Sequence, residues 1–411
     1  MRTKLLLLFI FGSILLLFEQ CRKDDITLYT VEWRYDRTGI YASETGLLKS
    51  WLAGGPELLW HYDGLGYGYS SAGISADKLY ITGMLDEKGY LFVFDLNGKL
   101  LHKLMYSDEW TANYIGTRAT PVINDGKIYL MSGVGDLICL DEKKLNVVWK
   151  RNILVDFESN NISWGINESP LIIGEKIIVT PGGKEHNVVA LNKNSGELIW
   201  SSPGVGDLSA YCSPLYIGEQ ETPLIVTITA NNMIGLEAST GNVLWSFESK
   251  NRNQIHSNTP VYANNMVLFS SVDKGCTMLR LSDGGRKAEI AWELPEWDNM
   301  MGGIVKVGDY LYGSGSGYKE RVWFCVEWET GEIKYKEGAL GMGATIVADG
   351  MMYCYTDKGE MALVRPIPEK FDVVSQFPVT LGTEQHWAHP VIYQGVLYVR
   401  HGDSLMAYKI R

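Results

Sequence analysis

The stretch Asn194-Ser195-Gly196-Glu197-Leu198-Ile199-Trp200 decides the fold, because its pattern returns along the chain. In each copy a glycine follows a polar turn and stands four residues before an aromatic or histidine ring. The copies run from Gly98 to His102, from Gly196 to Trp200, from Gly241 to Trp245 and from Gly331 to Tyr335. A pattern repeated at this scale predicts that the chain is an array of similar structural units.

A second landmark is a short apolar run that starts at a proline. It occurs at Thr120-Pro121, Ser169-Pro170, Ser213-Pro214, Thr259-Pro260 and His389-Pro390, and aligned starts without proline lie near Gly73, Ile304 and Thr345. The landmarks are about 45 residues apart, which is the length of one four-stranded blade of a β-propeller. Eight such starts predict eight blades.

The units consist of short runs rich in Val, Ile, Leu and Tyr that are separated by turn residues, which is typical of antiparallel strands. The last unit, from Pro390, has room for only three strands, whereas Glu57-Leu58-Leu59-Trp60 copies the fourth-strand pattern near the other end. We therefore expect residues 56–411 to form an all-β, eight-bladed β-propeller that is closed by pairing of its N- and C-terminal strands. Such closure removes the open sheet edges that invite aggregation.

Four tryptophans occupy the same position of the unit, namely Trp149, Trp200, Trp245 and Trp292. Large aromatic side chains contribute much of the buried area of a core, so we expect these four to pack between blades. The remaining cysteines, Cys139, Cys212, Cys276, Cys325 and Cys354, stand singly in predicted strands. Free buried thiols are the expectation, although an oxidising compartment would also permit a disulfide. Zinc and c-type haem are excluded because no Cys-x-x-Cys pair is present.

The N-terminus has the layout of a secretory signal. An apolar run from Leu5 to Phe18 is too short to span a bilayer comfortably, and Cys21 follows it. We interpret residues 1–21 as a lipoprotein signal peptide with lipidation at Cys21, and residues 22–55 as a tether and strap. An unprocessed membrane anchor and ordinary secretion remain the alternatives. The formal net charge of -11 argues against a nucleic-acid partner, which would require a basic face.

The segments that lead into the innermost strands should meet at the mouth of the central channel. They include Gly68-Tyr69-Ser70, Tyr211 and Asn299-Met300-Met301, and they are more polar and aromatic than the strands that follow. Our candidates for a ligand site at the mouth are Arg118, Trp164, Asn167, Glu168, His256, Asn258, His386, Trp387 and His389. Convergent polar groups within aromatic walls are typical of small-molecule sites.

These motifs resemble the quinoprotein-type eight-bladed propeller. The segments Glu44-Thr45-Gly46-Leu47-Leu48-Lys49-Ser50-Trp51 and Pro181-Gly182-Gly183-Lys184 are similar to secreted proteins with PQQ-like repeats, often named for BamB, the outer-membrane assembly lipoprotein. The resemblance implies a lipid-anchored protein of a Gram-negative outer membrane, either periplasmic or exposed at the surface. The acidic cluster Lys23-Asp24-Asp25 resembles a signal for surface export.

The resemblance also implies a possible quinone cofactor. Glu168, Asn167 and Asn258 offer oxygen ligands for Ca²⁺, Arg118 could bind a carboxylate of PQQ, and a tryptophan could stack on its ring. Against a working dehydrogenase, the adjacent cysteine pair found in many of these enzymes is absent, and short turns replace their long covering loops.

Three functions follow for the candidate site. The leading hypothesis is a non-catalytic binding or scaffold protein of the cell envelope, with an envelope protein or a small ligand as partner. The second is a PQQ- and Ca²⁺-dependent alcohol or sugar dehydrogenase. The third is a glycan-binding lipoprotein that uses Trp164 and Trp387.

Overall fold

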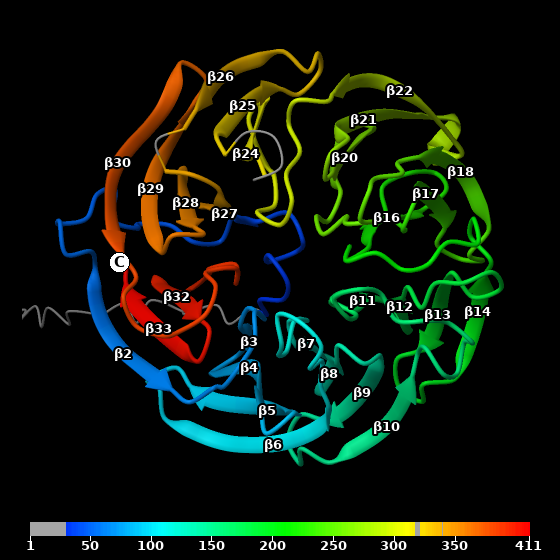
Figure 1. The fold of residues 1–411 in the computed structure, drawn as a ribbon, viewed down its shortest axis with the longest axis horizontal. Helices are drawn as coiled ribbons and strands as arrows, with labels where there is room; N and C mark the ends of the chain where they lie inside the picture. Colours follow the sequence, from blue (N-terminus) through cyan, green and yellow to red (C-terminus); the bar gives the residue numbers. More distant parts are fainter. Residues whose placement is uncertain (1–29, 317–320, 339) are drawn as a thin grey trace, which may run out of the picture.

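The computed structural model describes residues 30–316, 321–338 and 340–411, and it is an all-β ring. Its 33 strands within these ranges form eight sheets around a central axis, and the one short 3-10 helix is Asp283–Gly285 (Figure 1). The predicted eight-bladed propeller is confirmed. In this part of the chain no helix is long and apolar enough to cross a membrane. The predicted signal peptide and the predicted lipidation site at Cys21 lie outside the described residues.

Each blade is an antiparallel sheet whose strands follow one another from the channel outwards, and we number the blades along the chain. Blade 1 contains β3 (Gly73–Ser75), β4 (Lys78–Leu85), β5 (Lys88–Asp95) and β6 (Leu100–Asp108). Blade 2 contains β7 (Val122–Asn124), β8 (Lys127–Met131), β9 (Asp136–Asp141) and β10 (Val147–Asn152). Blade 3 contains β11 (Leu171–Ile173), β12 (Lys176–Val179), β13 (Val188–Asn192) and β14 (Leu198–Ser202). Blade 4 contains β15 (Leu215–Ile217), β16 (Leu224–Ile228), β17 (Asn232–Glu237) and β18 (Val243–Glu248).

The second half of the ring repeats this order. Blade 5 contains β19 (Val261–Ala263), β20 (Met266–Ser271), β21 (Gly275–Ser282) and β22 (Lys287–Leu294). Blade 6 contains β23 (Val305–Val307), β24 (Tyr310–Ser314), β25 (Trp323–Glu327) and β26 (Ile333–Glu337). Blade 7 contains β27 (Gly343–Ala348), β28 (Met351–Thr356), β29 (Glu360–Ile367) and β30 (Lys370–Pro378).

Blade 8 closes the ring with strands from both ends of the chain. Its three inner strands are β31 (Val391–Tyr393), β32 (Val396–His401) and β33 (Ser404–Lys409), and its outer strand is β2 (Glu57–Asp63). The pairing of β2 with β33 is antiparallel, from Glu57 opposite Lys409 to Asp63 opposite Ser404. The predicted closure by the two ends is therefore confirmed. A further strand, β1 (Ile40–Tyr41), pairs in parallel with β27 on the channel side of blade 7.

The repeated glycine and tryptophan form a joint between neighbouring blades. A Cβ atom on Gly196 of blade 3 would lie 2.9 Å from the ring of Trp149 in blade 2, and one on Gly241 would lie 2.5 Å from Trp200. The indole N–H of Trp149 also donates to the carbonyl of Lys193 in blade 3 at 2.9 Å. Trp60, Trp245 and Trp292 make the same hydrogen bond to the next blade, at 3.0, 3.2 and 3.0 Å. The glycine is thus required because the preceding blade's ring covers it.

The outer strand of every blade carries a register shift just before this joint. In blade 2 the shift lies between Val147 and Trp149, and the third and fourth strands of the other seven blades show one at the equivalent position. A β-bulge bends the strand and spoils its free edge as a template for another chain. Closure of the ring pairs the two chain ends but leaves an outer edge on each of the eight blades, and the bulges protect these edges.

The joint can be tested by comparing two glycines with similar backbone angles. Gly241 (φ +78°) contacts Trp200, whereas a Cβ on Gly126 (φ +71°) would have nothing within 4 Å. Both Gly→Ala changes strain a left-handed residue by about 1–2 kcal/mol, but Gly241→Ala adds an overlap that costs about 1–3 kcal/mol more. Urea unfolding of both variants measures the difference, and equal losses of stability would contradict the joint.

Candidate functional site

The channel is lined by hydroxyl groups that link successive blades. The backbone N–H of Ser71 donates to Oγ1 of Thr120 (3.2 Å), that of Thr120 to Oγ of Ser169 (3.0 Å), and that of Ser169 to Oγ of Ser213 (2.9 Å). Three of these residues precede a strand-initiating proline, and their hydroxyls satisfy buried N–H groups of the blade before. This accounts for the Ser/Thr-Pro landmark of the sequence.

A strap, which we define as residues 31–56, enters the channel and then crosses one face of the ring (dark blue in Figure 1). It begins with a two-bond bridge between Val31 and Ile74 of β3 (2.7 and 2.8 Å). The chain then reverses inside the channel, where Arg34, Tyr35 and Arg37 all have positive φ. Beyond β1 the strap reaches the turns that join the first and second strands, because Glu44 accepts backbone hydrogen bonds from Gln394 and Gly395.

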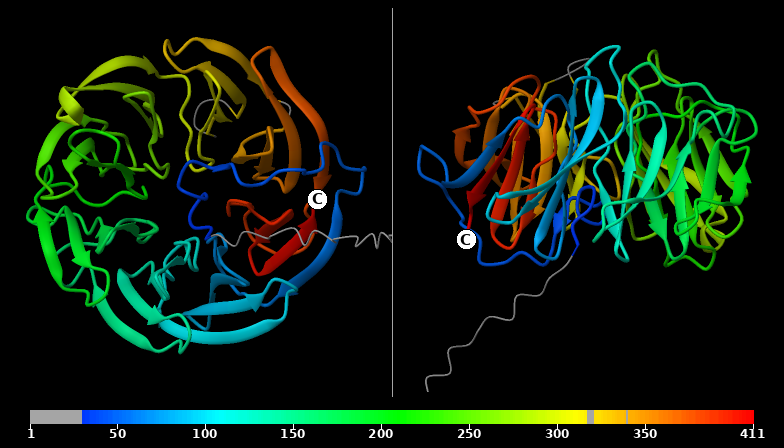
Figure 2. Two further views of the ribbon diagram at one scale, coloured as in Figure 1. Left: turned by 180° about the vertical axis from the view of Figure 1, so that it is seen from behind. Right: turned by 90° about the horizontal axis from the view of Figure 1, so that it is seen from below.

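The strap therefore approaches from the face that carries these inner turns, and the segments preceding the innermost strands lie at the opposite end of the channel. Figure 2 shows the dark blue strap towards one face of the disc. Trp51 anchors the outer part of the strap by packing against Phe377 and Tyr353, with ring centroids 5.3 and 5.8 Å away.

Two buried arginines hold the strap in the channel. Arg34, 3% exposed, donates to the carbonyls of Thr345 (3.0 Å) and Ile304 (3.3 Å) and contacts Nδ1 of His389 at 2.8 Å. Arg37, 6% exposed, donates to the carbonyls of Ser169 (3.1 Å) and Pro170 (2.7 Å). Burial lowers the pKa of Arg34 to about 10, so this guanidinium remains charged at neutral pH. The strap thus spans blades 3, 6, 7 and 8 from within.

Trp33 and His389 complete the contact between the strap and the ring. The indole N–H of Trp33 donates to Oγ1 of Thr259 at 3.1 Å, and its ring meets His389 edge to face at 4.8 Å. Burial, and then the charge of Arg34, lower the pKa of His389 to about 3. The neutral imidazole accepts from Arg34 at Nδ1 and donates from Nε2 to the carbonyl of Met301 at 2.8 Å.

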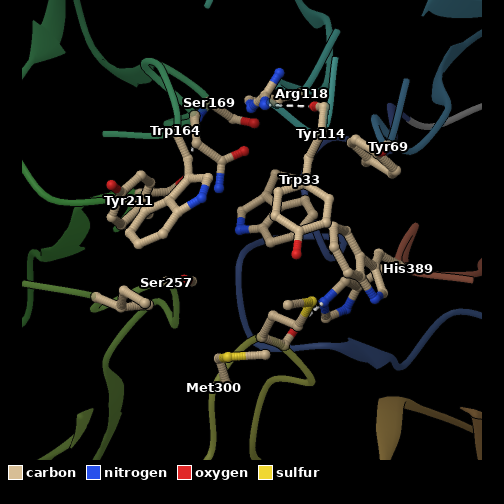
Figure 3. A pocket seen from close by; sticks show the side chains of 15 residues that line it. Trp33, Tyr69, Tyr114, Arg118, Trp164, Ser169, Tyr211, Ser257, Met300 and His389 are labelled. Atoms are coloured by element: carbon tan, nitrogen blue, oxygen red, sulfur yellow. Dashed lines mark hydrogen bonds between the residues drawn. The ribbon is translucent and has the colours of Figure 1, made fainter. Parts of the chain in front are cut away.

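A cavity of about 280 Å³ lies at the channel mouth, with Trp33 of the strap among its lining residues (Figure 3). It is lined by Trp33, Tyr69, Tyr114, Arg118, Trp164, Asn167, Ser169, Tyr211, Ser213, Ile255, Ser257, Met300, Met301, Trp387 and His389. These fifteen residues include six aromatic side chains and no carboxylate. The cavity is therefore largely apolar, with polar groups at a few points, as is usual for small-molecule sites.

The aromatic side chains form two groups. On one side Trp164 and Tyr211 lie 5.9 Å apart, and on the other Trp387 lies 5.1 Å from both Tyr69 and Tyr114. In Figure 3 the labelled rings of Trp164 and Tyr211 lie across the cavity from Tyr69 and Tyr114. A flat ligand could therefore contact rings on both sides.

Arg118 supports the loop that bears Tyr114. Its guanidinium donates to the carbonyls of Asn113 (3.2 Å), Tyr114 (2.6 Å) and Gly116, and lies 5.9 Å above the ring of Trp110. It has no carboxylate at ion-pair distance among the described residues. Most of its hydrogen-bonding capacity thus fixes the rim, although its positive charge remains at the cavity.

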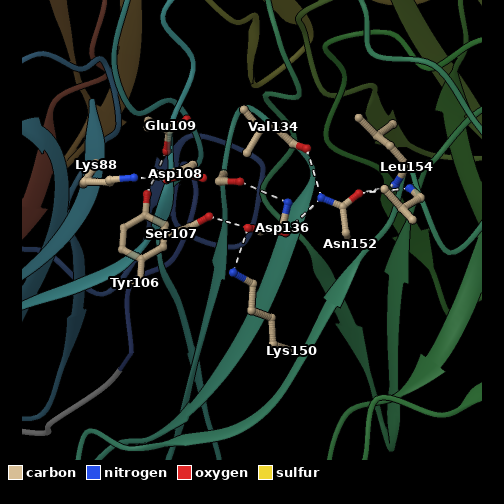
Figure 4. A network of polar contacts seen from close by, with 12 residues as sticks. Lys88, Tyr106, Ser107, Asp108, Glu109, Val134, Asp136, Lys150, Asn152 and Leu154 are labelled. Atoms are coloured by element: carbon tan, nitrogen blue, oxygen red, sulfur yellow. Dashed lines mark hydrogen bonds and ion pairs between the residues drawn. The ribbon is translucent and has the colours of Figure 1, made fainter. Parts of the chain in front are cut away.

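A buried polar network holds the start of this loop (Figure 4). Oε1 of Glu109 accepts from the N–H groups of Trp110 (2.9 Å) and Gly133 (2.6 Å), and Tyr106 donates to Oε2 at 2.9 Å. Burial raises the pKa of Glu109 to about 7. Asp136 adds a second link between blades 1 and 2, because it accepts from Ser107 at 2.5 Å and pairs with Lys150 at 2.8 Å.

The structure brings together five of the nine residues selected from the sequence. Arg118, Trp164, Asn167, Trp387 and His389 line the cavity, and His389 does so with both ring nitrogens engaged. Asn167, the indole N–H of Trp164 and the hydroxyl of Ser257 have no hydrogen-bond partner in the described part of the chain. These three groups are available to a ligand.

The other four candidates do not line this cavity. Oε1 of Glu168 accepts from the N–H of Thr180 at 2.7 Å, and His256 contacts the carbonyl of Ala230 at 3.2 Å. Asn258 donates to the carbonyl of Asn299 (2.8 Å) and accepts from the N–H of Gly303 (3.0 Å). His386 stacks on His401 at 3.6 Å and contacts the Tyr355 hydroxyl at 2.5 Å. Each of the four has a role in holding the ring.

Sequence reasoning missed two wall residues. Trp33 belongs to the strap, which carries no repeat pattern, and Tyr114 belongs to the loop between β6 and β7. Tyr69, Tyr211, Met300 and Met301 lie in segments that the sequence placed at the mouth, but they were not chosen as site residues. An unusual density of aromatic residues near the strand starts is the signal that could have identified them.

The residues at the mouth fit a calcium–PQQ site only in part. The aromatic walls and Arg118 suit a planar anion, but the cavity lining offers no carboxylate, and Glu168 and Asn258 are turned to backbone groups of neighbouring loops. In the described residues no group of three His, Cys, Asp or Glu side chains could hold a metal ion. The five cysteines of this part are free and buried. We therefore derive no chemistry through this cofactor.

The buried carboxyl of Glu168 makes the stability of the protein depend on pH. Burial, opposed by hydrogen bonds from Thr180 and the charge of Arg37, raises the pKa of Glu168 from 4.5 to about 7. Because the folded state binds this proton more tightly, its contribution to stability is complete below pH 4.5 and is lost as the pH rises through 7. We expect Glu168→Gln to remove that loss, on the order of 3 kcal/mol.

Urea unfolding of both proteins between pH 4 and 8 measures the effect. The stability of Glu168→Gln relative to the original protein should increase with pH across this window. A difference that does not change with pH would contradict the assignment.

Solved structures share this fold, and quinoprotein ethanol dehydrogenases match a short part of the sequence. BamB from Moraxella catarrhalis superposes with a TM-score of 0.61 at 12% identity, over 86% of this chain and 100% of that one. A europium-containing methanol dehydrogenase gives 0.64 at 12% identity, over 91% and 90%. A quinoprotein ethanol dehydrogenase of Pseudomonas aeruginosa is 29% identical over 85 residues, which cover 21% of this chain and only 13% of the enzyme.

The family comparison covers a larger part of the chain. Residues 87–337 match the model of the family described as outer membrane protein assembly factor BamB. This match extends from β5 to the end of β26 and thus includes more than half of the chain. The chain belongs to the family of outer membrane protein assembly factor BamB.

Proposed function

We propose that the protein is an exported, lipid-anchored binding protein of the cell envelope, and that the mouth cavity is its binding site. The observation that carries this proposal is the cavity itself, where aromatic walls surround polar groups that have no partner. Asn167, Trp164 and Ser257 would each gain a hydrogen bond from a ligand, and unpaired polar groups in a largely apolar site favour a ligand that pairs with them.

Export and anchoring rest on the N-terminal sequence together with the family match. The apolar run from Leu5 to Phe18 and Cys21 precede the described residues, and the matching family is named for outer membrane protein assembly. The described chain enters the ring from the face of the inner turns. A lipid on Cys21 would then hold this face towards the membrane and leave the mouth pointing away from it.

A PQQ-dependent dehydrogenase is the second candidate. The short match to quinoprotein ethanol dehydrogenases, 29% and 30% identical over 85 and 95 residues, and the presence of Arg118 between aromatic walls favour it. The described lining residues include no carboxylate, which weighs against it because Ca²⁺ prefers carboxylate and carbonyl oxygens.

Calorimetric titration of the protein with PQQ and Ca²⁺ separates these two candidates. We expect no saturable heat and no increase in thermal stability, since no carboxylate is among the described residues that line the cavity. Saturable micromolar binding that Arg118→Ala abolishes would replace the binding-protein proposal with the dehydrogenase.

Photo-crosslinking in cells tests the mouth as the binding site. A photoreactive amino acid in place of Tyr114, which is 51% exposed at the rim, should yield adducts with an envelope component. The same replacement at Glu369, an exposed residue of the turn between β29 and β30 on the other face, should yield none. Adducts at Glu369 but not at Tyr114 would show that the binding surface lies elsewhere.

A further inference from the structure

The residues that line the mouth cavity indicate which class of ligand it binds. Given the proposed binding function, three features of the cavity specify the chemical class of its ligand. They are the charge of its lining, the groups left without partners among the described residues, and the closed end formed by the strap.

The charge of the lining favours a ligand without strong charge. None of the fifteen described residues that line the cavity is acidic, so a cationic ligand would find no counter-charge among them. Arg118 is the one permanent cation of the lining, and it donates to the carbonyls of Asn113, Tyr114 and Gly116. The neutral His389 is bonded at both ring nitrogens. A dianion or trianion would therefore meet a single cation whose donors are largely in use.

The unpaired groups are those that pair with hydroxyls. The Asn167 amide both donates and accepts, the indole N–H of Trp164 donates, and the Ser257 hydroxyl does either. All three groups are neutral, and their residues line the same cavity. A ligand that complements them needs several hydroxyl or amide groups within a few ångströms of one another.

The aromatic rings supply the complementary apolar contact. Trp164 and Tyr211 lie across the cavity from Tyr69 in Figure 3, and Trp387 packs against both Tyr69 and Tyr114. A pyranose has faces rich in C–H groups and edges that carry hydroxyls, so its faces can pack on rings while its edges pair with amide, indole and hydroxyl groups. This combination distinguishes a saccharide from a purely apolar ligand, which would leave the three polar groups unpaired.

The strap limits how such a ligand can enter. Trp33 lines the cavity, while Arg34 and Arg37 fill the channel with bonds to four backbone carbonyls. A polymer therefore cannot thread through the ring and can only insert an end. The volume of about 280 Å³ lies near the lower limit of small-molecule pockets, about 300–1,000 Å³, which suits one or two sugar rings.

We propose that the mouth cavity binds the uncharged terminal saccharide of a glycan, with Trp164 as a stacking surface and Asn167 and Ser257 as partners of its hydroxyls. The glycan end enters from the side facing away from the tether, and Trp33 limits how far it inserts. A free oligosaccharide and a glycolipid headgroup present the same chemistry at the end of the glycan.

The test is an array of oligosaccharides with uncharged or acidic terminal residues, probed with the purified protein and followed by calorimetry with the best free oligosaccharide. Uncharged ends should bind, and acidic ends should bind more weakly. Trp164→Ala and Asn167→Ala should each weaken binding at least tenfold. Asn97→Ala, in the exposed turn between β5 and β6, is the matched control and should leave binding unchanged.

The thermal transition of each variant shows whether the ring remains folded, since neither Trp164 nor Asn167 belongs to the joints between blades. Vesicles carrying the same saccharide as a glycolipid headgroup distinguish the two sources. Binding that survives both cavity substitutions, or a preference for acidic ends, would overturn the saccharide proposal.

The two proposals fail in different ways. Adducts at Tyr114 with a protein, together with an empty array, would retain the binding function and reject the saccharide. The absence of both adducts and array binding would reject both.

Discussion

The contact of Arg34 and Arg37 with the inner backbone of the ring is the constraint on which the site depends. Eight strand starts turn their peptide groups towards one channel, and buried carbonyls need partners. The two guanidinium groups supply partners at Thr345, Ile304, Ser169 and Pro170, and they join blades that are far apart in the sequence. Without the strap the channel would be an open, hydrated hole. With it, the same ring encloses a cavity that is closed at one end.

The blade-to-blade joints and the strap stabilise different parts of the fold. The tryptophan–glycine joints set the spacing of neighbouring blades at the outer edge of the ring, where Trp149 donates to Lys193 and covers Gly196. The hydroxyl links from Ser71 to Ser213 set it at the channel. Two other residues that precede a strand-initiating proline contact the strap. Thr259 accepts a hydrogen bond from Trp33, and His389 accepts one from Arg34. The rigidity of the mouth therefore comes from structural contacts, which leaves Asn167, Trp164 and Ser257 free for binding.

The repeat pattern was sufficient to predict the fold because the glycine and the ring that a blade contributes to its two joints lie only four residues apart in the sequence. A glycine and a ring four residues apart determine the contacts of both neighbouring blades, so the number of blades and the closing pair of β2 and β33 followed directly. The site was predicted only in part. The sequence placed Arg118, Trp164 and His389 at the mouth, but the direction of Glu168 depends on the N–H of Thr180, twelve residues away just after the end of β12. The role of Trp33 could not be predicted, because the strap has no repeat and its partners lie more than 200 residues distant.

The strap is the element on which the account can be tested most directly, by hydrogen–deuterium exchange of the peptide covering residues 31–41. Backbone N–H groups of Val31, Arg37 and Gly39 are hydrogen-bonded inside the ring. If the strap closes the channel as described, this peptide should exchange as slowly as those from the inner strands, because it opens only when blades separate. Complete exchange within seconds, while β8 and β12 remain protected, would show that the channel is open and that the cavity lacks its closed end.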